Sequence, residues 1–314
     1  MTRRERATAF GPATVGNAAV GFDILGFATD SVGDRVTVRR IDDPTVEIGE
    51  ISGVVDELPR EASKNTATVG LLKIIEDFEL SFGFRVDIEK GIDLGSGMGG
   101  SAASAVAAVV AAAALIDREF TASELFGYAL AGEAVASGAA HGDNVAPCLL
   151  GGLTLIRSLV PMEVIQVPVP SSICCVLVKP EIRVDTREAR ELIPEAFDLP
   201  TIVGQTTNLS GFIAGCYRGD LELIGASLKD ILIEPHRAPL IKGFSQVRSE
   251  ALSAGALGCS ISGSGPSVFA WCDGEEDGRK VEEAMIQAFA DEGVGARGWT
   301  APVNQRGAYL VDRK

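Results

Sequence analysis

A glycine-rich stretch that leads into an uncharged segment is the feature that most limits how this chain folds. Residues 95–100 read GSGMGG, and no charged residue follows until Asp117. Glycine lets the backbone adopt positive φ and approach a ligand closely. The alanine- and valine-rich run from Ser101 predicts a helix that is apolar on every face, and such a helix must be buried. A glycine loop that opens into a helix N-terminus is a ready-made anion site, usually for phosphate.

Other interpretations of this stretch compete with a phosphate loop. A Walker P-loop requires a lysine after the glycines, which the chain lacks. Gly95, Gly97 and Gly100 match the dinucleotide-binding spacing, but the acidic residue about 20 positions on, Asp117, ends a predicted helix instead of a strand. A membrane helix is disfavoured because glycine, serine and alanine give little transfer energy. A buried core helix preceded by a flexible turn stays open.

Composition and charge argue against several classes of partner. The 314 residues, 46% of them hydrophobic, suit one large domain or two ordinary ones. A net charge of −15, from 43 acids against 28 bases, argues against nucleic acid or an anionic membrane as a partner. No apolar signal segment follows the first six residues. The 6 cysteines show no C-x-x-C spacing and there are only 2 histidines, so buried thiols in a reducing cytoplasm are expected and a zinc site is not.

A second constrained stretch, residues 12–27, reads PATVGNAAVGFDILGF. It follows a predicted first strand, residues 5–10, which a Gly11-Pro12 turn is expected to end. Polar and glycine residues in an apolar context are typical of a binding loop between strands. An ordinary hairpin connection, with Asn17 and Asp23 as turn residues, is the alternative.

Two further positions carry carboxylates that need an explanation. Thr121 and Glu124 form a capping box that predicts a helix reaching about residue 136. Glu133 falls in its last turns, where a carboxylate opposes the helix dipole and a metal ion would be a partner; a solvated glutamate is the alternative. Residues 138–147, GAAHGDNVAP, predict a loop that holds His141 and Asp143. A simple turn is again the alternative, and His141 as a metal ligand is disfavoured.

The remaining pattern predicts alternating strands and amphipathic helices. Strands are expected at residues 34–40, 45–51, 84–89, 151–156, 173–178 and 295–300. Helices are expected at residues 63–78, with Ser63 or Asn65 as N-cap, and at 201–218, 220–227 and 277–292. The proline-rich residues 160–170 are the best candidate for a linker. A third glycine-rich element, residues 255–270, sits between two strands, and a tight glycine hairpin is its plainest interpretation.

These stretches together resemble the GHMP small-molecule kinases. The loop follows the family pattern P-x-G-x-G-L-G-S-S-A, with Asp93, Met98 and Gly100 in place of its Pro, its Leu and its first Ser. Residues 255–267 resemble the third family motif, G-x-x-x-S-G-S-G-P-S/T. Residues 12–27 resemble the homoserine kinase branch in particular. Residues 180–190, PEIRVDTREAR, and 234–237, EPHR, resemble its P-x-I-x-V-x-T-x-x-A-R and E-P-x-R segments.

The resemblance implies an α+β fold with two domains and a site between them. Residues 1–159 would form a ribosomal S5-like α/β domain for the nucleotide and phosphate, and residues 160–314 a ferredoxin-like domain. The implied reaction is ATP-dependent phosphorylation of the hydroxyl of L-homoserine, with Mg²⁺, by a cytoplasmic homodimer that binds neither nucleic acid nor membrane. A GHMP kinase for another small alcohol, such as shikimate or mevalonate, or a non-catalytic ligand sensor are the alternatives.

The resemblance also assigns residues by position. Ser101 and Glu133 are expected to hold Mg²⁺ and, with Asn144 and Arg190, to form the catalytic set. Because Asn144 stands where several relatives have a catalytic Asp, and an amide does not accept a proton, no side-chain base is expected. The residues expected to bind ATP are Asn65, Lys90, Gly95, Ser96, Gly97, Met98, Gly99, Gly100, Ser101, Ala102 and Ser104. The residues expected to bind the amino-acid substrate are Asn17, Asp23, His141, Asp143, Thr186, Arg190 and Arg237. For both arginines, a surface ion pair is the alternative.

Overall fold

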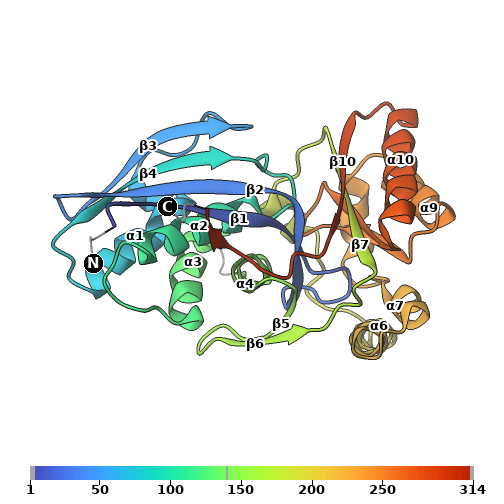
Figure 1. Ribbon diagram of the computed structural model, residues 1–314. Helices are drawn as coiled ribbons and strands as arrows, with labels where there is room; N and C mark the ends of the chain where they lie inside the picture. Colours follow the sequence, from blue (N-terminus) through green and yellow to red (C-terminus); the bar gives the residue numbers. More distant parts are fainter. Residues whose placement is uncertain (1–3, 139–140, 312–314) are drawn as a thin grey trace.

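The computed structural model describes residues 4–138 and 141–311. Two sheets organise this part of the chain, the first at one end of the molecule and the second at the other (Figure 1). No helix among the described residues is both long enough and apolar enough to cross a lipid bilayer.

The first sheet has the order β11-β1-β2-β4-β3. Strand β5 pairs with the first residues of β2, and β6 pairs with β5. Its neighbours are antiparallel except β3 and β4. Along β4 the buried Phe84, Val86 and Ile88 alternate with more exposed residues, so one face is apolar. Helices α1 and α2 cover that face, and α3 packs against both of these helices (Figure 1). The strands are β1 (Arg6–Gly16), β2 (Leu25–Ile41), β3 (Val46–Gly53), β4 (Gly83–Lys90), β5 (Leu153–Ser158), β6 (Glu163–Val167) and β11 (Tyr309–Leu310).

Small side chains allow the central helix to lie close to this sheet. Helix α2 (Gly100–Ala113) is the predicted alanine- and valine-rich helix, and most of its residues are buried. A Cβ on Gly11 of β1 would lie 2.4 Å from the carbonyl oxygen of Ala103, so only glycine permits this approach. The helices beside it are α1 (Thr66–Asp77), α3 (Ala122–Ser137) and α4 (Gly142–Leu150), with a 3₁₀ turn, η1 (Ala62–Lys64), before α1.

The second sheet confirms the ferredoxin-like prediction. Its strands β7, β8, β9 and β10 pair antiparallel in the order β10-β7-β9-β8, and helices fall between β7 and β8 and between β9 and β10. The strands are β7 (Ile173–Pro180), β8 (Gly258–Ile261), β9 (Val268–Asp273) and β10 (Ala296–Pro302). The helices are α5 (Thr186–Glu191), α6 (Leu199–Arg218), α7 (Leu221–Ser227), α8 (Glu234–Arg237), η2 (Ala238–Leu240), α9 (Phe244–Ser253) and α10 (Glu275–Asp291).

Alternation along the second sheet divides the apolar interior into two clusters. Val176 of β7 packs with α9 and α10, whereas Leu177 faces a core that is continuous with the first sheet. Phe27 of β2 joins the two sheets, because its ring centroid lies 5.4 Å from that of Trp271 and 5.5 Å from that of Phe269. These ring contacts pack the two sheets against each other.

Three predicted breaks in the chain were wrong. The expected linker, residues 160–170, contains β6, which pairs with β5 in the first sheet. Gly11 and Pro12 do not end the first strand: β1 continues to Gly16, and its pairing with β2 shifts register after Pro12. At such an irregularity the missing proline N–H costs no ladder hydrogen bond. Residues 142–147 are not a loop but the start of α4, because apolar residues that follow the polar ones, Val145 among them, are buried and outweigh turn propensity. Ala139 and Ala140 of that predicted loop lie outside the described residues.

The expected division into residues 1–159 and 160–314 stays a prediction. Its boundary falls between β5 and β6, which pair with each other in the first sheet. The chain also returns to the first sheet near its end, where β11 pairs with β1.

Candidate active site

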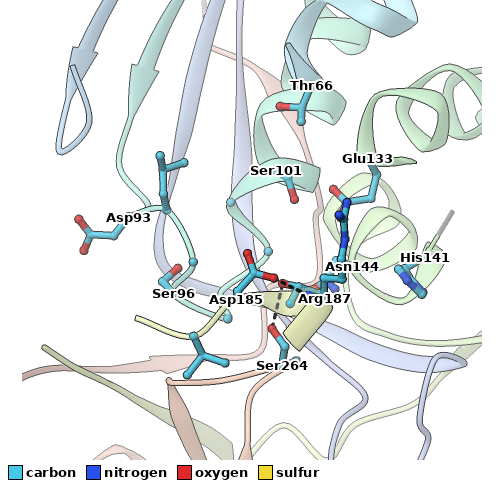
Figure 2. A pocket seen from close by; sticks show the side chains of 18 of the residues that line it. Thr66, Asp93, Ser96, Ser101, Glu133, His141, Asn144, Asp185, Arg187 and Ser264 are labelled. Carbon is cyan, nitrogen blue, oxygen red and sulfur yellow. Dashed lines mark hydrogen bonds between the residues drawn. The ribbon is translucent and has the colours of Figure 1, made fainter. Parts of the chain in front are cut away.

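A cavity of about 760 Å³ opens between the glycine loop and the segments that precede α4 and α5 (Figure 2). All predicted site residues line it except Met98 and Ala102, which are buried behind the loop in the apolar core. The folded chain therefore brings the predicted residues together in one site, from positions as far apart in the sequence as Asn17 and Arg237. The assignments to ATP, metal and substrate stay predictions.

The glycine loop has the geometry that its sequence predicts. Gly95, Gly97 and Gly99 have φ of 61°, 74° and 67°, a region that favours glycine. A Cβ on Gly97 would lie 2.6 Å from the carbonyl oxygens of Ser262 and Gly265 in the third glycine-rich element, so the two loops are in backbone contact. Gly99 is the N-cap of α2, and the first N–H groups of this helix face the cavity side of the loop.

A buried ion pair that the sequence did not indicate supports the start of the loop. The Lys90 ammonium contacts Asp34, and it also donates to the Gly100 carbonyl at 2.9 Å and to Ser104 Oγ at 3.0 Å. Asp34 Oδ1 accepts from the backbone N–H groups of Gly91 and Ile92 at 3.0 and 3.2 Å. Lys90 and Ser104, both predicted to bind ATP, therefore also hold the loop in place.

Glu133 lies beside the N-terminus of α2. The predicted capping box is present, since Thr121 and Glu124 exchange hydrogen bonds at the start of α3, and this helix carries Glu133 into the cavity wall. Glu133 is 6% exposed. Burial raises its pKa to about 7, the charge of Asp143 adds to the increase, and a hydrogen bond from Ser101 opposes it. The Glu133 carboxylate and the Ser101 hydroxyl therefore lie close together. A cation bound by both would offset the free-energy cost of burying the Glu133 charge.

A turn between β1 and β2 forms the opposite wall. Asn17 and Asp23 have φ of 66° and 62°, so they are the turn residues that the sequence suggested. Asn17 also spans the site: its backbone N–H donates to Asp143 Oδ2 at 3.1 Å, and its side-chain amide donates to the Gly263 carbonyl at 2.9 Å. Burial raises the pKa of Asp143 to about 6, and the Asp23 charge contributes.

Arg190 and Asp23 pair with each other across the cavity. Arg190 Nη2 lies 2.7 Å from both carboxylate oxygens of Asp23 and 3.3 Å from His141 Nδ1. A hydrogen bond to Asp23 raises the pKa of His141. Although burial alone would raise the pKa of Asp23, the hydrogen bonds from His141 and Arg190 hold it below its ordinary value. The surface ion pair that we considered for Arg190 is therefore present, but it lies within the cavity.

Arg237 is not a surface arginine. It is 3% exposed and donates to the Gly263 carbonyl at 3.0 Å and to the Ala189 carbonyl at 3.3 Å. Desolvation lowers its pKa, and the nearby Arg190 charge contributes. The guanidinium groups of Arg190 and Arg237 each lie 5.2 Å from the centroid of the Phe22 ring. Two cations are thus held at one end of the cavity.

The other predicted residues have structural partners as well. Asn65 is the N-cap of α1, where its side chain accepts from Ala67 N at 3.0 Å, and it still lines the cavity. Asn144 Oδ1 accepts a 2.8 Å hydrogen bond from Thr14 Oγ1, which fixes the amide orientation. Thr186 Oγ1 lies 3.1 Å from Ser264 Oγ in the third glycine-rich element. Sequence reasoning missed several residues of the site or its support, among them Thr14, Asp34, Arg183 and Arg187, because nothing local distinguishes these from ordinary strand or surface residues.

Comparisons with known proteins agree with this geometry. Residues 65–152 match the family model described as the GHMP kinases N-terminal domain, and residues 212–291 match that of the GHMP kinases C-terminal domain. The chain is 50% identical over 308 residues to a homoserine kinase of Xylella fastidiosa (strain M12), covering 98% of this chain and 94% of that protein. It is 49% identical over 307 residues to a homoserine kinase of Xanthomonas campestris pv. campestris (strain B100), covering 97% and 94%.

A solved structure is also similar to this protein in its fold. The crystal structure of a homoserine kinase from Cytophaga hutchinsonii superposes with a TM-score of 0.95 at 41% identity, covering 99% of each chain. The relatives match essentially the whole chain, including both sheets and every wall of the cavity. The chain belongs to the GHMP kinase family, on the branch of the homoserine kinases.

Proposed function

We propose that this protein transfers the γ-phosphoryl group of ATP to the hydroxyl of L-homoserine, giving O-phospho-L-homoserine for threonine biosynthesis. The observation that carries the proposal is a cavity with a phosphate loop at one end and a balanced set of charged groups at the other. Phosphoryl transfer needs mainly positioning and charge stabilisation, and this cavity offers both. Consumption of ATP and six buried thiols both fit a cytoplasmic enzyme.

The polar end of the cavity suits a zwitterionic amino alcohol. Arg190 and Arg237 supply two guanidinium groups for a carboxylate, which accepts charge-assisted hydrogen bonds from such a fork. Asp143 and Asp23 supply acids for an ammonium group. A substrate held by both ends is left with its hydroxyl free to face the phosphate loop. A sugar or an isoprenoid alcohol lacks the paired charges that this end provides.

The nucleotide end suits ATP with a divalent cation. Backbone N–H groups at the start of α2 and in the glycine loop can donate hydrogen bonds to phosphate oxygens. Ser101 and Glu133 would hold Mg²⁺, which takes few protein ligands and completes its shell with phosphate and water. The donor set fits, because the buried Glu133 has a pKa of about 7 and gains from a nearby cation. When bound, Mg²⁺ supplies positive charge to the phosphoryl oxygens.

We propose that no side chain accepts the hydroxyl proton, because the cavity carboxylates Glu133 and Asp143 are assigned to the metal and to the ammonium group. Asn144 occupies the relevant wall, and its amide is held by Thr14 at 2.8 Å. A loose transition state needs little activation of the nucleophile. We therefore propose that the proton leaves late, and that Asn144 orients the hydroxyl without accepting its proton.

The test is an ADP-release assay with Mg·ATP and a panel of small alcohols. L-homoserine should give turnover well above that with shikimate, mevalonate or galactose. The Glu133→Gln variant is the control for ADP release that does not depend on the active site. Equal or better turnover of any other alcohol would refute the homoserine assignment, and binding of homoserine and ATP without turnover would favour a ligand sensor.

We also propose that the protein forms a homodimer through one face of α6. Leu199, Ile202, Val203 and Tyr217 on this helix are 72%, 45%, 56% and 58% exposed, and no charged residue occurs in residues 199–217. The partner proposed is a second copy of this chain. Two chains that each carry a net charge of −15 repel each other least across such an uncharged face.

The ends of α6 are complementary in charge. Asp198 caps the start of the helix and Arg218 ends it. A two-fold antiparallel arrangement places each Asp198 near the partner's Arg218 and opposes the helix dipoles. Thr206 and Thr207 on this helix donate their hydroxyls to carbonyls four residues earlier, at 2.8 and 2.9 Å, so these side chains do not need water.

A further inference from the structure

Two arginines without an assigned role, Arg183 and Arg187, line the same cavity as the glycine loop. Arg183 lies between β7 and α5, and Arg187 is in the first turn of α5. The segment is firmly placed, because Asp185 Oδ1 accepts from the backbone N–H groups of Arg187 and Glu188 at 2.8 and 3.2 Å. Both arginines therefore enter the cavity from the side that faces the glycine loop.

The two side chains reach different parts of the cavity. A Cβ on Gly95 would lie 3.2 Å from Cγ and 3.4 Å from Nε of Arg183, so the side chain of Arg183 runs along the start of the loop. A Cβ on Gly138 would lie 3.6 Å from Nη2 of Arg187. Gly138 ends α3, the helix that carries Glu133. Figure 2 shows Arg187 on the side of the cavity where Glu133 and Ser101 lie.

Arg183 and Arg187 differ from the other cations that line the cavity, because those cations have partners in the protein. Of the cations that line the cavity, Lys64 pairs with Glu61 at 2.6 Å, Lys90 pairs with Asp34, and Arg190 pairs with Asp23. Arg237 donates to two backbone carbonyls. Within the described part of the chain, no ion pair involves Arg183 or Arg187.

The absence of an ion pair at Arg183 and Arg187, within the described residues, is notable in so acidic a chain. The chain has 43 acids against 28 bases, so an arginine has many carboxylates to meet. Two guanidinium groups that face a phosphate loop and meet no carboxylate there are free to receive an anion. A triphosphate brings several negative charges next to the acids Glu133 and Asp143, and such a site is stabilised by additional cations.

We propose that Arg183 and Arg187 bind the phosphates of ATP, Arg183 at the β-phosphate near the start of the loop and Arg187 at the γ-phosphoryl group that is transferred. The guanidinium fork matches phosphate oxygens and can make two parallel hydrogen bonds. Arg187, beside Ser101 and Glu133, stabilises charge on the γ-phosphoryl oxygens as the bond to the β-phosphate breaks. An arginine in this role is worth up to about 10³–10⁵ in turnover in other phosphoryl-transfer enzymes.

The direct test measures nucleotide binding by calorimetry without any acceptor alcohol. The probes are adenosine, ADP and the non-hydrolysable ATP analogue AMPPCP, with Mg²⁺ present. Arg183→Ala should weaken both ADP and AMPPCP about tenfold, whereas Arg187→Ala should weaken AMPPCP about tenfold and ADP little. Adenosine should bind both variants as it binds the wild type. Arg279→Ala removes an exposed arginine of α10, outside the cavity, and is the matched control.

Two results would overturn the proposal. One is an unchanged affinity of both variants for ADP and AMPPCP, which would mean that water alone solvates these arginines. The other is an equal loss for adenosine, which would mean that the substitutions disturb the pocket and not a phosphate contact. In turnover, Arg187→Ala should lower kcat on the order of 10²-fold, and Arg187→Lys should restore part of it.

The proposal rests on the proposed function in its choice of nucleotide. The binding series needs no acceptor, so it decides the role of the arginines separately from the alcohol panel. A chain that binds AMPPCP in the predicted pattern but phosphorylates none of the alcohols would refute the homoserine assignment and support the arginine contacts.

Discussion

Replacing Glu133 by glutamine should change activity and stability in opposite directions. In the metal-free protein the carboxyl group has a pKa of about 7, against an ordinary value of 4.5, because it is buried. Folding therefore costs nothing extra below about pH 4.5, where the group is protonated in both states. Above pH 7 the buried carboxylate destabilises the fold by about 3 kcal/mol, since one pKa unit corresponds to about 1.4 kcal/mol.

An amide is neutral at every pH, so Glu133→Gln removes this cost. Without Mg²⁺ or nucleotide, the variant should melt about 5 °C above the wild type at pH 8 and near the wild type at pH 4.5. Its turnover with Mg·ATP should fall about 10²–10³-fold, because a ligand for the metal that stabilises phosphoryl charge is lost. Added Mg²⁺ should raise the melting temperature of the wild type more at pH 8 than at pH 6, and that of the variant little.

The measurements are thermal melts by scanning calorimetry at several pH values and steady-state ADP release. Glu76→Gln, an exposed glutamate on α1, is the control and should change neither quantity. Lower stability of Glu133→Gln at both pH values would refute the argument, because it would make Glu133 a partner in a structural network. Activity near that of the wild type would show that the metal is held elsewhere.

Three other substitutions test separate parts of the site and surface. Arg237→Lys keeps the charge but loses the planar fork, so KM for homoserine should rise at least tenfold and KM for ATP little; unchanged KM values would remove Arg237 from the substrate site. Val203→Glu should turn a dimer into a monomer by light scattering, whereas Leu252→Glu, at a 43% exposed position on α9, should not; a wild-type monomer would exclude the α6 interface. Gly97→Ala should weaken AMPPCP binding strongly, because its Cβ would lie 2.6 Å from two carbonyl oxygens at a φ of 74°, whereas Gly127→Ala meets nothing within 4 Å and should bind normally.

Local rules explain what could be predicted from the sequence. The capping box at Thr121 and Glu124 acts within three residues, and the structure contains it. The glycines of the loop need no distant partner to adopt positive φ, so the loop and the buried helix after it were predicted correctly. The alternation of β4 is equally local. The ferredoxin-like fold was expected from the family resemblance, and the strand order of the second sheet agrees with it.

Contacts between distant segments explain what could not be predicted. Asp34 pairs with Lys90 of β4, and in the sequence it resembles any charged residue of a strand. Helix α4 begins with residues that favour turns, but a Cβ on Gly26 would lie 1.8 Å from the Asp143 carbonyl oxygen, so α4 is set by close packing against β2. The sequence predicted which segments form the site through family resemblance, whereas the ion pairs inside it depend on the folded chain.

The pairing of Arg190 with Asp23 bears on how the site selects its substrate. The proposed function assigns Arg190 to the substrate carboxylate and Asp23 to the ammonium group, and in the structure these two side chains meet each other at 2.7 Å. A zwitterion can take the place of both partners at once, because it brings one charge of each sign and leaves neither residue unpaired. A ligand with a single charge would break the pair and leave one of these two half-buried groups without a partner. The ion pair therefore favours amino acids over simple acids, amines and neutral alcohols.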